Sequence, residues 1–89
     1  MTISRDKVFL VVKKIIQVDL KFSGIEVVDE LQLVGGGLGL DSLDLLMLVT
    51  GIDKEFAYKI SPKKLNRDSM STVGKFVDFV FSELAAAGL

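Results

Sequence analysis

The stretch from Gly39 to Asp44, Gly-Leu-Asp-Ser-Leu-Asp, holds the residues whose types and order best suit chemistry. Ser42 stands at the predicted start of a helix, directly after a glycine-rich loop. The backbone N–H groups and the dipole of such a helix end favour an anion. Asp41 is placed to help a visiting enzyme hold a divalent metal, because carboxylate oxygens suit a hard cation. The sequence therefore predicts a modifiable serine that carries an anionic group.

The composition excludes most other kinds of chemistry. The chain has 89 residues, no cysteine and no histidine. Disulfides, thiol or imidazole metal sites, cysteine nucleophiles and histidine general bases are therefore all excluded, and serine–histidine catalysis with them. A formal net charge of −1 argues against a nucleic-acid partner, which would require a basic surplus. We expect no catalytic residues and no bound metal in this chain.

Two long helices with apolar stripes are predicted in the first part of the chain. One precedes the Ser42 segment, and the other begins within it. Ser4 is a predicted N-cap, and we expect a first helix from Ser4 to Leu20. The second helix begins at Asp41-Ser42, and its core stripe consists of Leu45, Leu48, Val49, Ile52 and Phe56. Gly51 inside this helix predicts a close contact with another helix, because glycine otherwise weakens a helix. The glycines at 35–37 and 39 predict a flexible loop, and no phosphate-binding motif accompanies them.

The second half of the chain predicts a short helix and a long one. Ser61-Pro62 resembles an N-cap followed by proline at the first helical position, which indicates a short third helix. The last helix is predicted to start near Ser71 and to end before Gly88. No segment alternates with the period of a strand. We expect one all-α domain over residues 1–89, with three longer helices and one short third helix.

At the segment from Gly39 to Asp44 the chain resembles the acyl carrier proteins, and the resemblance covers nearly the whole chain. The family places Asp-Ser-Leu at the start of a second helix, as Asp41-Ser42-Leu43 does here. Further matches are Asp53-Lys54-Glu55-Phe56, Ile60-Ser61-Pro62 and Ser71-Thr72-Val73. The resemblance implies a four-helix acyl-carrier-type bundle.

The resemblance also implies a cofactor and a function. Ser42 would carry a covalent 4′-phosphopantetheine arm, transferred from coenzyme A by a phosphopantetheinyl transferase. Asp41 would serve in recognition by the transferase and its metal, and Leu43 completes the motif. The arm would supply the thiol that the cysteine-free chain lacks. The protein would then carry acyl thioesters between acyl-loading and acyl-processing enzymes of fatty-acid or specialised lipid or polyketide-like biosynthesis. A peptidyl or aminoacyl carrier and a non-carrier helical interaction module are the alternatives.

A partner surface is predicted on the side of the second helix that lies off its core stripe. By resemblance this side meets partner enzymes, and the residues that we assign to it, besides Leu43, are Asp44, Leu46, Met47, Thr50 and Asp53. Clustered exposed apolar residues often mark binding sites. The alternative is that some of these side chains are buried against the glycine loop.

The distribution of charge departs from the usual acidic pattern of the family. Residues 41–56 carry four acids against Lys54, a net of −3, whereas residues 59–67 carry Lys59, Lys63, Lys64 and Arg67 and no acid, a net of +4. One interpretation is a solvated surface; the other is that the basic segment Lys59–Arg67 selects a dedicated partner through like-charge rejection of the others.

The cellular setting is predicted from absences in the sequence. Only five apolar residues, Val8 to Val12, follow the first charges, so no export signal is indicated. The longest uncharged stretch is too short to span a bilayer. We expect a cytoplasmic monomer without membrane or nucleic-acid partners.

Overall fold

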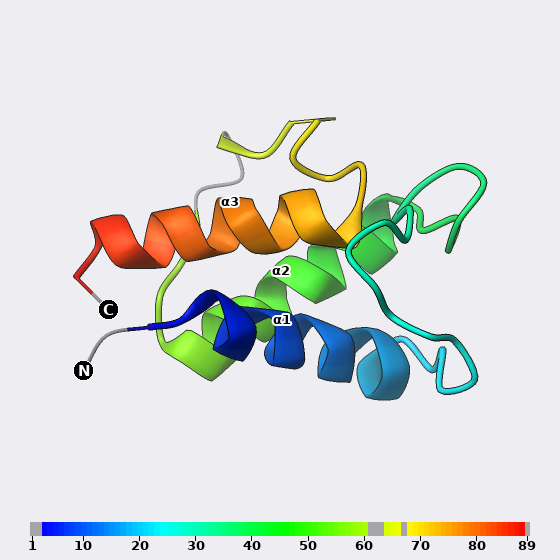
Figure 1. Ribbon diagram of the computed structural model, residues 1–89, viewed down its shortest axis with the longest axis horizontal. Helices are drawn as coiled ribbons and strands as arrows, with labels where there is room; N and C mark the ends of the chain where they lie inside the picture. Colours follow the sequence, from blue (N-terminus) through cyan, green and yellow to red (C-terminus); the bar gives the residue numbers. More distant parts are fainter. Residues whose placement is uncertain (1–2, 61–63, 67, 89) are drawn as a thin grey trace.

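In the part of the chain that the structure describes, three helices and one π-helical turn form the regular structure (Figure 1). The structure, a computed structural model, describes residues 3–60, 64–66 and 68–88. In chain order the elements are α1 (Arg5–Lys14), η1 (Ile15–Asp19), α2 (Ser42–Phe56) and α3 (Val73–Ala86). Within the described residues the only β-type pairing is one isolated bridge between Gln32 and Thr72. The predicted all-α class is therefore confirmed, whereas the short helix predicted at Ser61-Pro62 lies outside the described residues.

The first helical segment has the predicted bounds but an unexpected final turn. The Ser4 side chain caps α1 by accepting a hydrogen bond from the backbone N–H of Lys7 at 3.2 Å. The last turn, η1, is a π-helix with Leu20 as its C-cap. Because π-turns are rare and interrupt the regular spacing of side chains, the apolar periodicity did not reveal this one.

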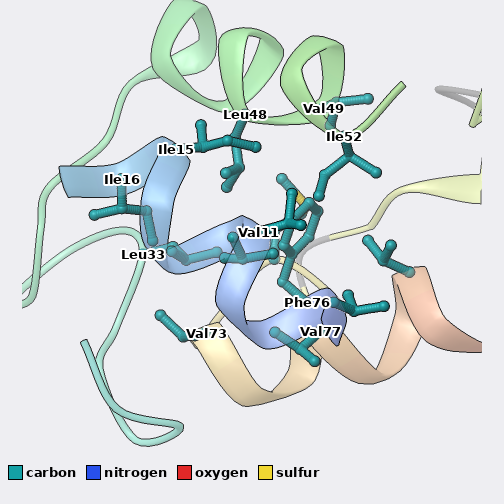
Figure 2. Close-up of a cluster of buried hydrophobic side chains, with 14 of the residues drawn as sticks. Val11, Ile15, Ile16, Leu33, Leu48, Val49, Ile52, Val73, Phe76 and Val77 are labelled. Atoms are coloured by element: carbon teal, nitrogen blue, oxygen red, sulfur yellow. The ribbon is translucent and has the colours of Figure 1, made fainter. Parts of the chain in front are cut away.

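The core lies between the three helices, where their apolar stripes meet (Figure 2). From α2, Leu48, Val49 and Ile52 are buried, as predicted, while Leu45 and Phe56 are half-buried at its edge. Phe76 of α3 is fully buried. Burial of each such side chain contributes about 1.5 to 3 kcal/mol to folding. A Cβ added to Gly51 would lie 2.8 Å from Cδ1 of Ile15, which confirms the predicted close contact.

The long connection between η1 and α2 is anchored against the start of α3. The backbone N–H of Leu33 donates to the carbonyl of Ser71 at 3.0 Å, and that of Val73 donates to the carbonyl of Leu31 at 2.9 Å. The glycine loop then folds back, with the N–H of Leu38 donating to the carbonyl of Gln32 at 2.8 Å. These bonds hold a segment whose composition predicted only a flexible loop.

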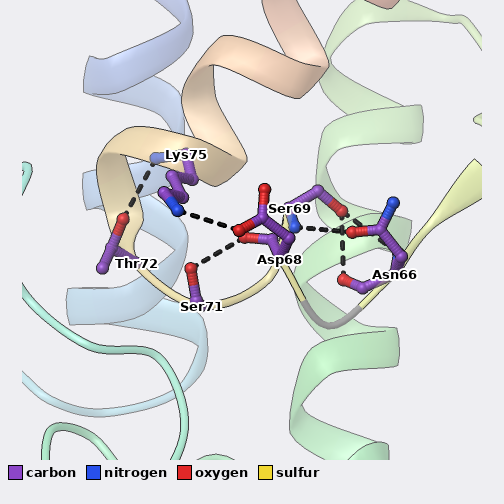
Figure 3. Close-up of polar contacts among 6 residues, drawn as sticks. All are labelled: Asn66, Asp68, Ser69, Ser71, Thr72 and Lys75. Carbon is purple, nitrogen blue, oxygen red and sulfur yellow. Dashed lines mark hydrogen bonds and ion pairs between the residues drawn. The ribbon is translucent and has the colours of Figure 1, made fainter.

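The turn that leads into α3 is held by side-chain hydrogen bonds (Figure 3). Thr72 caps the helix and accepts from the N–H of Lys75 at 3.2 Å. The ammonium group of Lys75 in turn lies 2.8 Å from a carboxylate oxygen of Asp68. The last helix thus begins at Val73, two residues after the predicted start near Ser71.

Arg5 connects the start of α1 to α3 and to the long connection. Its guanidinium lies 2.5 Å from the carboxylate of Asp78 and 3.4 Å from that of Asp29. The hydrogen bond to Asp78 raises the pKa of Arg5 above its ordinary value, so this group stays charged. Exposed pairs of this kind contribute at most about 1 kcal/mol each.

Candidate functional site around Ser42

Ser42 is the first residue of α2, and its side chain is exposed. The residue before it, Asp41, is the N-cap: its carboxylate accepts the backbone N–H of Asp44 at 2.9 Å. The carboxylate of Asp44 accepts the N–H of Asp41 at 3.4 Å, which completes a reciprocal capping box. The start of α2 is therefore fixed by its two aspartates, and Ser42 between them bears no part of the cap.

The geometry at Ser42 suits a hydroxyl that a second protein modifies. Within the described residues, no hydrogen bond engages the Ser42 hydroxyl, which remains accessible. The first turn of a helix presents N–H groups and a positive dipole end to an anion. Asp41 is also exposed, so its carboxylate can face a visiting enzyme while one of its oxygens holds the cap.

An apolar groove of about 770 Å³ begins beside Ser42 and runs along α2. One side is formed by α2 itself and the other by the segment that precedes α3. Its lining residues are Val34, Ser42, Leu45, Leu46, Val49, Leu65, Asn66 and Met70. A flexible group attached to Ser42 would have this groove directly beside its attachment point, so the site fits a long prosthetic group and an apolar cargo.

The predicted partner surface is exposed. We call Leu43, Leu46, Met47 and Thr50 the α2 face. Leu43 is 68% exposed, Leu46 58% and Met47 47%, and Thr50 is also exposed. The alternative, burial against the glycine loop, is therefore wrong for these three apolar residues. Exposed apolar side chains this close together form a patch suited to binding another protein.

The two aspartates predicted to bind partners take part in local structure. Asp44 belongs to the capping box. Asp53 is half-buried, and its carboxylate accepts the backbone N–H of Ile60 at 3.0 Å, which holds the turn after α2. A structural role for Asp53 was not anticipated from the sequence, because it depends on a turn seven residues away. Binding of partners by Asp44 and Asp53 stays a prediction.

The basic segment Lys59–Arg67 is described only in part, since Lys63 and Arg67 lie outside the described residues. Lys59 is exposed. The ammonium group of Lys64 lies 3.1 Å from a carboxylate oxygen of Glu83 in α3. This contact ties one of the four basic residues to the bundle, and selection of a partner by the segment stays a prediction.

Sequence reasoning missed most of the groove. Val34 and Asn66 lie on loops, and Leu65 and Met70 belong to a segment without a clear periodic pattern. No local signal marks these residues, because the groove forms only when distant segments pack together. The half of the groove that belongs to α2 follows from its helical spacing.

Comparison with known proteins relates this chain to a family. The sequence model described as the phosphopantetheine attachment site matches residues 11–80, a range that includes Ser42. Among curated proteins, the acyl carrier protein of Thermotoga maritima is 37% identical over 81 residues. That alignment covers 91% of this chain and 96% of the relative.

Proposed function

The chain belongs to the acyl carrier protein family, whose prosthetic group is a covalently attached 4′-phosphopantetheine, and from this membership we propose that Ser42 is the attachment point. The observation that carries the proposal is the position of Ser42: an exposed hydroxyl on the first turn of α2, at the end of an apolar groove. A phosphopantetheinyl transferase with coenzyme A as donor would install the arm.

Each residue of the Asp41-Ser42-Leu43 motif has a separate task in this proposal. Ser42 offers the hydroxyl, and the first turn of α2 stabilises the phosphate that it receives. Asp41 turns a carboxylate oxygen to the metal of the transferase while holding the cap. Leu43, 68% exposed, is an apolar contact for the transferase. When bound, the arm supplies a thiol, a group absent from the chain itself.

The cargo is an apolar acyl chain, as in fatty-acid or specialised lipid or polyketide-like biosynthesis. The groove beside Ser42 supports this choice, because six of its eight lining residues are apolar: Val34, Leu45, Leu46, Val49, Leu65 and Met70. Burying methylene groups there gains about 0.8 kcal/mol each. The alternative, an aminoacyl or peptidyl cargo, has polar groups, and the groove lining provides few polar side chains to pair with them.

The protein acts as a carrier that presents its bound acyl group to other enzymes. It supplies no catalytic residue of its own, and the bond-making steps belong to acyl-loading and acyl-processing enzymes that contact the α2 face. We propose that the protein acts in the cytoplasm and as a monomer. None of the helices in the described part of the chain is long and apolar enough to cross a membrane.

A thiol titration tests the proposal, because the chain contains no cysteine. Incubation with coenzyme A, magnesium and a broad-specificity transferase, followed by removal of coenzyme A, should leave one thiol per chain. The variant Ser42→Ala should stay at zero with an unchanged helical circular dichroism spectrum. Equal thiol content in the two proteins would contradict the assignment of Ser42.

Loading of the thiol then separates the two kinds of carrier. The modified protein is offered to an acyl-activating ligase with fatty acids and to an adenylating enzyme with amino acids. We expect a thioester, released by hydroxylamine, with the fatty acids. Loading with amino acids alone would favour the aminoacyl alternative.

A further inference from the structure

The groove beside Ser42 contains one amide side chain, that of Asn66. Among the described residues that line the groove, Asn66 and Ser42 are the only two with polar side chains. The function proposed above uses Ser42 for attachment and the apolar residues for the cargo, and it gives the amide of Asn66 no task. A polar group in an apolar groove has to be hydrated or paired, so this amide affects which chains the groove accepts.

Hydrogen bonds to Ser69 fix the orientation of the Asn66 side chain (Figure 3). Its Oδ1 accepts the backbone N–H of Ser69 at 2.8 Å. The backbone of Asn66 is held as well, because its N–H donates to Oγ of Ser69 at 3.1 Å and its carbonyl accepts from the Ser69 hydroxyl at 3.1 Å. A backbone N–H can only donate, so the amide atom that faces Ser69 is the oxygen, and the nitrogen Nδ2 points away from Ser69.

The Nδ2 group of Asn66 is therefore a donor of fixed orientation. Within the part of the chain that the structure describes, no hydrogen bond engages it. The residue is exposed, so water satisfies the donor when no chain covers it. A saturated acyl chain that displaced this water would leave the donor unpaired, whereas a chain with a carbonyl oxygen at this point would pair it.

We propose that Nδ2 of Asn66 donates a hydrogen bond to a carbonyl oxygen of the cargo, so that the groove holds β-ketoacyl chains in preference to saturated chains of equal length. Carbon–carbon joining of two acyl thioesters leaves a carbonyl at the β-carbon, which makes these chains the oxygenated cargo of the biosynthesis proposed above. A site that hydrogen-bonds its ligand discriminates against an analogue without the bonding group. The inference rests on the proposed function, because it requires a cargo carried beside the groove.

A spectroscopic measurement observes this hydrogen bond directly, since Asn66 is the only asparagine of the chain. Protein made with isotope-labelled asparagine gives one side-chain amide signal pair in a proton–nitrogen NMR spectrum. Three forms are compared: the unloaded arm, a saturated acyl form and a β-ketoacyl form of equal length. We expect the amide proton signals of Asn66 to move downfield in the β-ketoacyl form alone.

The other results of this measurement would overturn the proposal. An equal shift in the saturated form would mean that the groove does not recognise the oxygen. A full shift with the unloaded arm would assign the bond to an amide carbonyl of the arm, and no shift in any form would exclude the bond. Intact mass establishes loading beforehand, so failure to modify Ser42 contradicts the proposed function, whereas a negative spectrum of loaded protein contradicts only this inference.

The variant Asn66→Asp separates the donor from the structural role of the residue. Aspartate keeps the oxygen that accepts the N–H of Ser69 and caps a turn about as well as asparagine, but it lacks the donor. The matched control is Gln32→Glu, the same exchange of amide for carboxylate at an exposed residue outside the groove lining.

Urea denaturation of the loaded variants gives the size of the effect. Asn66→Asp should raise the unfolding equilibrium constant of the β-ketoacyl form about fivefold more than that of the saturated form, the change expected for the loss of one hydrogen bond. Gln32→Glu should change the two forms equally. Equal changes of the two forms in Asn66→Asp, or the same difference in Gln32→Glu, would overturn the assignment of Asn66.

Discussion

Asp41 combines two tasks that separate substitutions can distinguish. One carboxylate oxygen accepts the N–H of Asp44 at 2.9 Å and so fixes the start of α2. The side chain is nevertheless exposed, which leaves it accessible to the metal of a transferase. An uncharged residue with the same capping ability would retain the first task and lose the second.

We therefore predict different results for Asp41→Asn and Asp41→Ala. Asparagine caps a helix about as well as aspartate, so Asp41→Asn should keep its free energy of unfolding to within a few tenths of a kcal/mol. Alanine should cost about 1 kcal/mol. Both variants should be modified by the transferase more slowly than the wild type. Urea denaturation and the rate of modification measure the two effects, and wild-type modification of Asp41→Asn would show that the charge is not used.

The glycine loop is a structural element that positions the start of α2 despite its composition. Leu38 and Leu40 are buried, and the N–H of Leu40 donates to the carbonyl of Leu33 at 2.9 Å. The return of the loop brings Gly37 against the backbone of Gln32. A Cβ added to Gly37 would lie 2.1 Å from the Gln32 carbonyl oxygen, which cannot move without breaking its bond to Leu38.

Two neighbouring glycines should accordingly respond differently to alanine. Gly37→Ala should lower the free energy of unfolding by about 1 to 3 kcal/mol, the usual cost of a forced contact in a packed region. In Gly36→Ala the nearest atom to the added Cβ is the side-chain Oε1 of Gln32 at 3.4 Å, so its stability should stay near that of the wild type. Urea denaturation of both variants provides the measurement. Equal stabilities would mean that the loop is not held against Gln32.

At the level of the whole bundle, the packing of distant segments creates the groove that begins at Ser42. Val34, Leu65 and Met70 come from two connections, yet they face the same side of α2. An acyl chain carried on the arm and placed in this groove would bury part of its apolar surface against the bundle. The stability of the whole fold should then depend on the cargo.

We predict that the free energy of unfolding rises with the length of the attached acyl chain. Each methylene that enters the groove adds about 0.8 kcal/mol at most, and the rise should stop once the groove is filled. Urea denaturation of the unloaded protein and of a series of loaded forms would show this trend. A carrier with a charged group at the end of the cargo is the control and should gain less. Equal stability for all lengths would place the cargo outside the groove.

Local features of this structure followed from the sequence, whereas features made by distant contacts did not. Ser4 was identified as a cap, and Gly51 as a close helix contact, because both depend on neighbouring residues or on helical spacing. The π-turn η1 interrupts that spacing and was missed. The hydrogen bond from Ile60 to Asp53 was missed as well, since it depends on the path of the chain after α2.

The candidate site divides in the same way. The proposed attachment residue, Ser42, and the exposed positions of the α2 face follow from one motif and one helical pattern. The groove could not be predicted, because its second side includes Leu65, Asn66 and Met70 and no local pattern directs these toward α2. The exposed helix start at Ser42 could therefore be predicted from the sequence, whereas the shape of the groove could not.

Intact mass spectrometry tests the central claim most directly. The wild type, Ser42→Ala and Ser82→Ala are each incubated with coenzyme A, magnesium and a transferase; Ser82, an exposed serine in α3, is the matched control. We predict a gain of one phosphopantetheinyl group in the wild type and in Ser82→Ala, localised by fragmentation to the peptide that contains Ser42, and no gain in Ser42→Ala. A gain that persists in folded Ser42→Ala would contradict the assignment of Ser42.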